Sequence, residues 1–186
     1  MSRPWRPGRE ELGAAAGRRV PDVISTGLDV LFCGINPGLY SGAVGHHFAR
    51  PGNRFWPALA ASGFTDRVLS PFEEAELLTF GLGITNLVAR ATASADDLAS
   101  EELRRGARAL ARRVRRCRPR FVAFLGLGAY RVAFGRPNAG VGPRPEPVGP
   151  ARAWLLPNPS GLNAHWRPPE LAEAFTELRQ AVRPEA

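Results

Sequence analysis

The sequence predicts an α/β domain with a mainly parallel central sheet. The strongest signal is a set of short apolar runs, each ended by turn residues, as in strands that are buried on both faces. Helix-like segments separate these runs, and such alternation is typical of a parallel sheet covered by helices. The strand-like runs span residues 28–34, 83–88, 120–126 and 151–156.

Cap residues mark two of the predicted helices. Asn53 and Gly63 are placed as the N-cap and the stop of one helix. The segment from Ser70 to Glu73 has the pattern of a capping box with proline at the first helical position, and Gly81 ends that helix. These two helices are expected over residues 53–63 and 70–81.

Apolar periodicity predicts the longest helix, over residues 100–117, with Leu103 and Leu110 on its inner face and arginines outside. We interpret the arginine face as solvated surface in preference to a phosphate track. Residues 135–150 hold five prolines and four glycines and are expected to form an irregular loop. Further helices are expected over residues 9–16, 129–134 and 169–182.

The length of 186 residues corresponds to one domain. We place this domain at residues 27–183, between an Arg/Pro-rich N-terminal arm (1–26) and a short tail (184–186). No apolar run reaches the roughly 18 residues of a membrane span, and residues 1–8 lack the apolar stretch of a secretory signal. The expectation is a monomeric cytoplasmic protein, nucleoid-associated if its source is bacterial.

The charge is strongly positive. Twenty-five basic residues against 17 acidic ones give a net charge of +8, and all the basic residues are arginine because the sequence contains no lysine. A side-chain Schiff base and a lysine-dependent phosphate loop are therefore excluded. Arginine makes two-pronged contacts with phosphate, which favours a nucleic-acid partner. A merely solvated basic surface is the alternative.

Metal and cofactor sites are not expected. Cys33 and Cys117 are too few for a four-cysteine zinc or iron–sulfur site. The three histidines, His46, His47 and His165, lack the spacing of a helical zinc motif.

Sites in parallel sheets lie at the carboxyl ends of the strands, so the loops after Cys33, Thr85 and Leu156 are the candidates. The first holds Gly34-Ile-Asn-Pro-Gly38, in which Asn36 can hold a water or contact a heterocycle edge. Its glycine spacing is not that of a dinucleotide-binding loop. An ordinary strand-to-helix turn is the alternative.

The third loop, residues 158–165, combines small polar residues with one large apolar side chain, Leu162. An apolar side chain on a glycine/serine turn is suited to entering a base stack. The alternative is a leucine that folds back into the core.

Three motifs taken together carry a family resemblance. Gly34-Ile-Asn-Pro-Gly38, the segment from Gly45 to Trp56, and Asn158-Pro-Ser-Gly-Leu162 resemble the mismatch-specific uracil/thymine-DNA glycosylase family. The resemblance covers roughly residues 20–182. It implies a three-layer α/β/α sandwich of the uracil-DNA glycosylase type and a monofunctional enzyme. Such an enzyme flips a mispaired pyrimidine out of the duplex, hydrolyses its bond to the sugar and leaves an abasic site.

The resemblance also assigns residues to roles. Asn36 is implied to position the attacking water. Because a carboxamide cannot deprotonate water near neutral pH, we expect a slow enzyme that acts best on bases that leave easily. The implied contacts to the base come from Ile35, Ser41, His46, Phe48, Asn86 and Asn158.

The resemblance places Leu162 as the wedge that fills the gap left by the flipped nucleotide. Its neighbours Ser160, Gly161 and Asn163 are implied DNA contacts, with backbone groups meeting the unpaired guanine. Ala164 departs from the family, which often has arginine there, and His165 or Arg167 are the candidate substitutes. Base-excision repair by this route also implies downstream enzymes that process abasic sites.

The resemblance leaves the substrate open. His46 and His47 resemble the thymine-processing branch, whereas Ser41 resembles the bacterial uracil branch. Uracil opposite guanine, in double-stranded DNA with G·U or G·T mispairs, is therefore the expected substrate, with thymine and modified pyrimidines as further candidates. The alternatives are a broad-specificity uracil-DNA glycosylase and a non-catalytic protein that binds damaged DNA.

Overall fold

A five-stranded sheet in the order β2-β1-β3-β5-β4 forms the centre of the computed structural model, which describes residues 6–184. Neighbouring strands are parallel except for β4, which runs antiparallel to β5. The strands are β1 (Val30–Gly34), β2 (Leu82–Asn86), β3 (Phe121–Leu125), β4 (Gly142–Val148) and β5 (Ala151–Leu156). The predicted α/β class with a mainly parallel sheet is confirmed.

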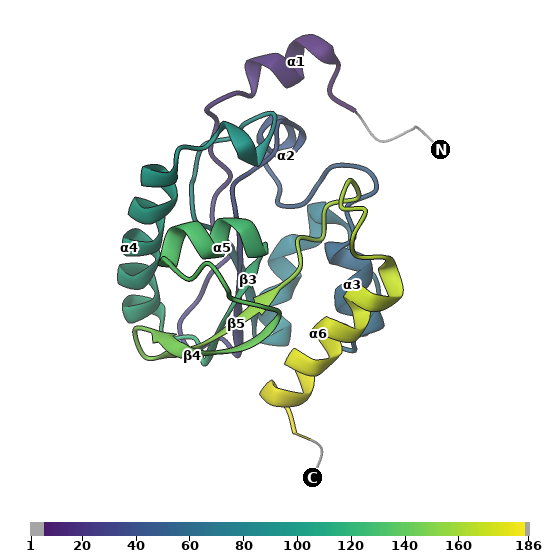
Figure 1. Ribbon diagram of the computed structural model, residues 1–186. Coiled ribbons are helices and arrows are strands. Elements are labelled where there is room, and N and C mark those ends of the chain that lie inside the picture. Colours follow the sequence, from purple (N-terminus) through teal and green to yellow (C-terminus); the bar gives the residue numbers. More distant parts are fainter. Residues whose placement is uncertain (1–5, 185–186) are drawn as a thin grey trace.

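Helices cover both faces of the sheet (Figure 1). Successive side chains of β1 point to opposite faces, so Phe32 packs under the helices of one layer and Leu31 under those of the other. Apolar side chains fill the space between the sheet and the helices on each face. The fold is therefore a three-layer α/β/α sandwich. The first layer contains α3 (Phe55–Ala61) and α6 (Pro168–Val182), and the second contains α4 (Ser100–Cys117) and α5 (Leu127–Phe134).

The strand β4 overturns the expectation of an irregular loop over residues 135–150. Pro143, Pro145 and Pro147 occupy alternate positions, so the residues between them keep their N–H groups for pairing with β5. Because β4 is the last strand of the sheet, its outward groups need no partner strand. The proline count therefore indicated an edge strand and not the absence of a strand.

The segment from Ser70 to Gly81 begins and ends as predicted but is wound more tightly. Ser70 Oγ accepts from the Phe72 amide at 3.3 Å, and Gly81 ends the helix in the left-handed conformation (φ 72°). Between them, η1 (Pro71–Phe80) is a 3₁₀ helix. Two further elements, α2 (Leu39–Val44) and η2 (Ala95–Asp97), form in segments expected to be loops.

The segment expected to be an N-terminal arm is packed against the domain. Its helix, α1 (Arg9–Ala14), falls where a short helix was expected. Beyond it, Ala15 and Val20 are buried, and Val23 exchanges two backbone hydrogen bonds with Ile84 of β2, at 2.9 and 2.8 Å. Since β2 is the other edge of the sheet, this contact covers its open groups. Residues 1–5 and 185–186 lie outside the described residues.

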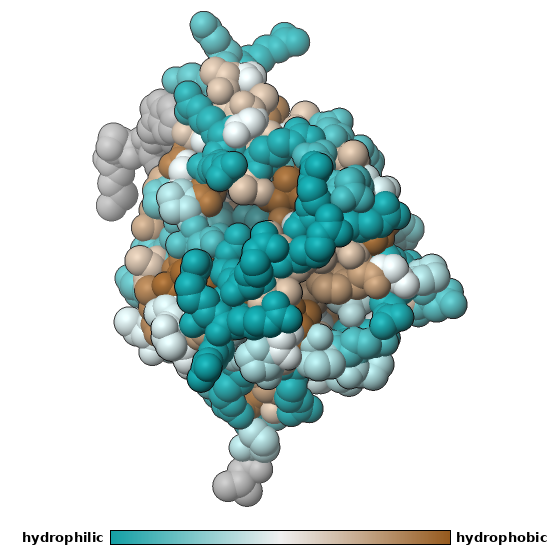
Figure 2. Space-filling view, turned by 90° about the vertical axis from the view of Figure 1, so that its left-hand side faces the viewer, coloured by the Kyte–Doolittle hydropathy of each residue, from teal (hydrophilic) through white to brown (hydrophobic). Residues whose placement is uncertain are grey.

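The face built by α4 is predominantly hydrophilic (Figure 2). Exposed arginines such as Arg104, Arg108, Arg112 and Arg115 follow the outer side of the helix, as its sequence predicts. Arg108 Nη2 forms an ion pair with Glu101 Oε1 at 3.0 Å. Within residues 6–184, no helix combines the length and the apolar character needed to cross a membrane.

Candidate active site

A cavity of about 490 Å³ opens where β1, β2 and β5 end. All three predicted loops line it, those after β1, β2 and β5, and the loop after β2 contributes residues 92–95. The loops singled out in the sequence therefore meet at one cavity, at the carboxyl ends of the parallel strands. The predicted site residues that line the cavity are Ile35, Asn36, Ser41, Phe48, Asn86, Asn158, Ser160 and Leu162.

The orientation of the Asn36 amide is fixed by its partners. Its Nδ2 donates to the Arg90 carbonyl at 2.9 Å and to Thr92 Oγ1 at 2.7 Å. A carbonyl can only accept, so the atom facing Arg90 is the nitrogen. With both amide hydrogens used, Asn36 Oδ1 has no partner among residues 6–184 and is left to accept a hydrogen bond from water in the cavity.

Two residues that the sequence analysis did not single out support this arrangement. Thr92 donates its only hydroxyl hydrogen to the Ser94 carbonyl at 2.7 Å, so its oxygen must accept from Asn36. Arg90 is held by Glu102, with N–O distances of 2.7 and 2.9 Å. Hydrogen bonding to Arg90 lowers the pKa of Glu102 to about 2, so the pair is ionised at neutral pH.

One wall of the cavity depends on a close approach at Gly34. A Cβ on this residue would lie 2.5 Å from Asn86 Oδ1 and 3.3 Å from Phe48 Cζ, so only glycine fits. The Phe48 ring lies 4.3 Å from that of Phe55, centroid to centroid. Phe48 also has a left-handed backbone (φ 50°), a conformation that bulky residues rarely adopt and that here occurs at a cavity wall.

The orientation of the Asn86 side chain is fixed through His47, a buried residue. His47 Nε2 lies 2.8 Å from the Pro21 carbonyl and must carry the hydrogen. Burial lowers the pKa of His47, which favours the neutral ring. Its Nδ1 is then an acceptor facing Asn86 Nδ2 at 3.4 Å. Asn86 Oδ1 is thereby turned toward Gly34.

His46, a predicted base contact, is not among the residues that line the cavity. Its Nδ1 lies 2.9 Å from Glu74 Oε1, and its ring lies 4.8 Å from that of Phe72. The same Glu74 accepts the backbone N–H of His47 at 2.8 Å. The second histidine of the pair, not the first, therefore faces the cavity, because Glu74 holds His46 and the backbone of His47 on the other side.

The loop after β5 is ordered by its own side chains. Asn158 Oδ1 accepts from the Ser160 amide at 2.9 Å, and Asn163 Nδ2 donates to the Asn158 carbonyl at 3.0 Å. Leu162, at the tip, is 74% exposed, so it does not fold back into the core. Gly161 and Asn163 flank it without lining the 490 Å³ cavity.

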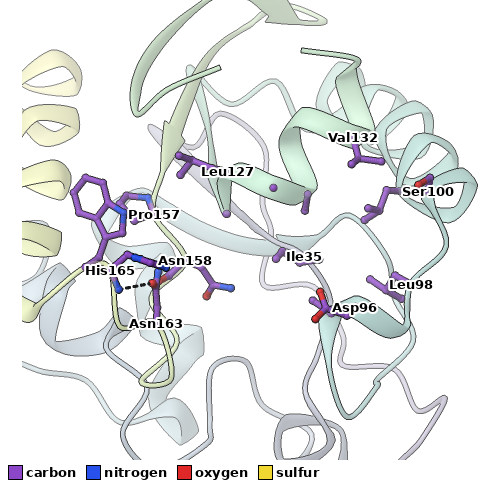
Figure 3. Close-up of a pocket in the computed structure, with 16 residues that line it drawn as sticks. Ile35, Asp96, Leu98, Ser100, Leu127, Val132, Pro157, Asn158, Asn163 and His165 are labelled. Carbon is purple, nitrogen blue, oxygen red and sulfur yellow. Dashed lines mark hydrogen bonds between the residues drawn. The ribbon is translucent and has the colours of Figure 1, made fainter. Parts of the chain in front are cut away.

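A second cavity, of about 740 Å³, shares Ile35, Ala95 and Asn158 with the first. Figure 3 shows Asn158 and Asn163 on the loop after β5, across this cavity from Asp96 and Leu98. Asn158 therefore lies at the boundary between the two cavities. Its position depends on its hydrogen bonds to Ser160 and Asn163 within the loop.

The sequence profile of the Uracil DNA glycosylase superfamily matches residues 21–180. The chain belongs to the uracil DNA glycosylase superfamily. The matched range contains every residue that lines the 490 Å³ cavity except Leu12 of α1. The family match and the cavity therefore concern the same part of the chain. At the level of the family, the chain is a DNA glycosylase, a hydrolase of N-glycosyl bonds in base-excision repair.

A solved structure supports the fold assignment. The solution NMR structure of a proposed uracil DNA glycosylase from Methanosarcina acetivorans aligns with a TM-score of 0.55 at 17% sequence identity. The alignment covers 88% of this glycosylase and 98% of the archaeal chain. Among the residues that the structure describes, no group of three or more His, Cys, Asp or Glu side chains is arranged to hold a metal ion.

Proposed function

We propose that this glycosylase removes uracil mispaired with guanine from double-stranded DNA, by hydrolysis and without strand cleavage. The observation that carries the proposal is the Asn36 amide, whose two hydrogens are held by Arg90 and Thr92 while Oδ1 faces the cavity. An amide oxygen fixed in this way orients a water molecule toward the anomeric carbon. Such positioning lowers the barrier without the amide taking a proton.

The base would bind between Phe48 and Asn86. Phe48 supplies a ring face at the cavity wall, on which a flipped pyrimidine can stack. Asn86 Oδ1 is an acceptor, because its nitrogen faces His47. It therefore suits a base with an N–H at that edge, such as uracil, and disfavours cytosine, whose ring nitrogen there is an acceptor.

Departure of the base would be assisted by Asn158. Since Asn158 Oδ1 accepts from the Ser160 amide, its Nδ2 is the group left to donate to the oxygen of the leaving base. A neutral amide stabilises the developing anion less than a charged group does. This supports modest catalysis and a preference for bases that leave easily. Thymine and modified pyrimidines opposite guanine remain part of the proposal as poorer or alternative substrates.

Selectivity for mispairs would come from the loop that carries Leu162. The exposed leucine would fill the gap in the stack, while Ser160 and the backbone of Gly161 and Asn163 would contact the opposite strand. Extrusion costs less for a mispaired base, which adds to the selectivity. We further propose that the enzyme acts as a monomer and that, lacking lysine, it leaves an abasic site for other repair enzymes.

The test is single-turnover base release from oligonucleotides with G·U, A·U, G·T or single-stranded uracil, with alkali to reveal abasic sites. Cleavage of G·U well above A·U and single strands is the expected result, and G·T cleavage measures how far the pocket accepts thymine. Equal cleavage of all uracil substrates would replace the proposal with a broad-specificity enzyme. Binding without any cleavage would identify a damage-binding protein.

A further inference from the structure

A single guanidinium holds the loop that carries Leu162. Arg54, the residue before α3, donates from Nη1 to the carbonyls of Trp166 at 2.6 Å and Asn163 at 3.1 Å, and from Nη2 to that of Gly161 at 3.3 Å. Its backbone N–H also donates to the Pro159 carbonyl at 2.9 Å. Four carbonyls spread over the loop therefore converge on one residue from a different part of the chain.

The loop that carries Leu162 also packs closely against the turn that precedes Arg54, at Gly52. A Cβ on Gly161 would lie 2.4 Å from the Gly52 carbonyl oxygen, closer than real Cβ atoms come, so the backbone of the loop can take this position only with glycine there. Gly52 itself has a left-handed backbone (φ 86°). The close contact between the loop and the turn therefore depends on both Gly161 and Gly52.

This arrangement has an energetic consequence for Leu162. A leucine that is 74% exposed gains free energy by folding onto nearby apolar surface. Charge-assisted hydrogen bonds to the carbonyls on both sides of the leucine oppose that collapse. With the backbone of the loop held in this way, Leu162 remains exposed in the free protein.

We propose that Arg54 is a positioning residue that preforms the Leu162 wedge and does not itself contact DNA. The inference rests on the proposed function, because it assigns the loop the role of a wedge. Preforming the loop removes the cost of ordering it when DNA binds. Lysine cannot replace arginine here, since an ammonium lacks the planar fork that reaches several carbonyls at once.

The experiment compares Arg54→Met and Arg54→Lys with Arg136→Met, which removes an arginine that pairs with Glu146 away from the loop. Single-turnover rates are measured on a G·U duplex and on uracil in an unpaired bulge. We expect Arg54→Met to slow the duplex reaction about tenfold or more, and to change the bulge reaction little, because an unpaired base needs no wedge. Arg54→Lys should recover only part of the rate, and Arg136→Met should match wild type.

Two readouts need no activity. Hydrogen exchange of the Asn163 amide, which donates to the Ser160 carbonyl within the loop, should accelerate in the free Arg54→Met protein. The salt dependence of DNA binding should be unchanged, whereas loss of a phosphate contact would reduce the slope of log K against log salt by about 0.9. Gly161→Ala, which pushes the loop away from Gly52 and from the Arg54 side chain, should accelerate exchange at Asn163 and slow the duplex reaction as Arg54→Met does.

The outcomes separate the inference from the function on which it rests. If Leu162→Ala leaves the duplex rate unchanged, the wedge assignment is wrong, and exchange at Asn163 still tests whether Arg54 orders the loop. If Leu162→Ala slows the duplex reaction but Arg54→Met and Arg54→Lys do not, Arg54 is not a positioning residue. Equal slowing of duplex and bulge, or a reduced salt slope, would also overturn the proposal.

Discussion

Thr92 Oγ1 lies 2.7 Å from Asn36 Nδ2 and 2.7 Å from the Ser94 carbonyl, so one hydroxyl group both donates and accepts at the centre of the site. Because the threonine hydrogen goes to the carbonyl, the asparagine must present its nitrogen to Thr92 and its oxygen to the cavity. A threonine in the loop after β2 thereby determines which end of the Asn36 amide is left without a protein partner at the cavity.

Thr92→Val should slow single-turnover cleavage of G·U by about a hundredfold, the scale of a misplaced reacting group. Valine has a similar shape but cannot accept from Asn36, so the amide loses one of its two anchors. Thr92→Ser keeps the hydroxyl and should stay near the wild-type rate. Equal rates for the valine and serine variants would show that Thr92 does not orient Asn36.

Asn36→Ala should reduce cleavage by at least about a hundredfold while leaving binding to a G·U duplex within a few-fold of wild type. The amide acts on the water and not on the DNA, which is why the two measurements separate. Asn138→Ala, in an exposed turn away from the cavity, is the matched control. Parallel loss of binding and cleavage would assign Asn36 a structural role.

Gly34→Ala should abolish base release with little loss of folding. The added Cβ would meet Asn86 Oδ1 at 2.5 Å and fill the space beside Phe48, which the base would occupy. Gly140→Ala, where a Cβ meets nothing within 4 Å, is the control for the glycine substitution. Base release is followed by alkaline cleavage, and thermal unfolding of both variants checks the fold. An active, folded Gly34→Ala protein would place the base elsewhere.

Acidification should destabilise the protein through His47. Burial lowers the pKa of His47 below the value of 6.5 expected in the unfolded chain. Between the lowered pKa and 6.5 the unfolded state binds more protons, so the free energy of unfolding falls as the pH decreases through this window. Urea unfolding from about pH 5 to pH 8 measures the effect.

His47→Gln removes the titrating ring and should flatten that pH profile in the same window. The variant keeps a polar side chain beside Asn86, so it is a milder change than an apolar substitution. Profiles of the same steepness for wild type and variant would mean that His47 does not contribute.

Local sequence signals predicted most of the fold because the elements are specified locally. Residues 100–117 form α4 with the predicted bounds, since the apolar side chains lie on one face and an acidic first turn precedes a basic last turn. The buried strands were found for a similar reason, as runs of apolar residues between turns. The strand β4 was missed because its prolines are compatible only with the edge of a sheet, and the position of a strand in the sheet is not a local property.

The candidate site likewise has features that are local in the sequence and features that depend on distant residues. The order of residues along the chain already defines the chemistry available: an asparagine after the first strand, a leucine on a small polar loop, and arginine without lysine. Folding is needed to define which side-chain amide atoms of Asn36, Asn86 and Asn158 are held by the protein and which are left for a ligand. Each orientation is set by a partner distant in the sequence or by the loop backbone, as Arg90 does for Asn36 across 54 positions. Hydrogen-bond direction depends on contacts that exist only once the chain has folded.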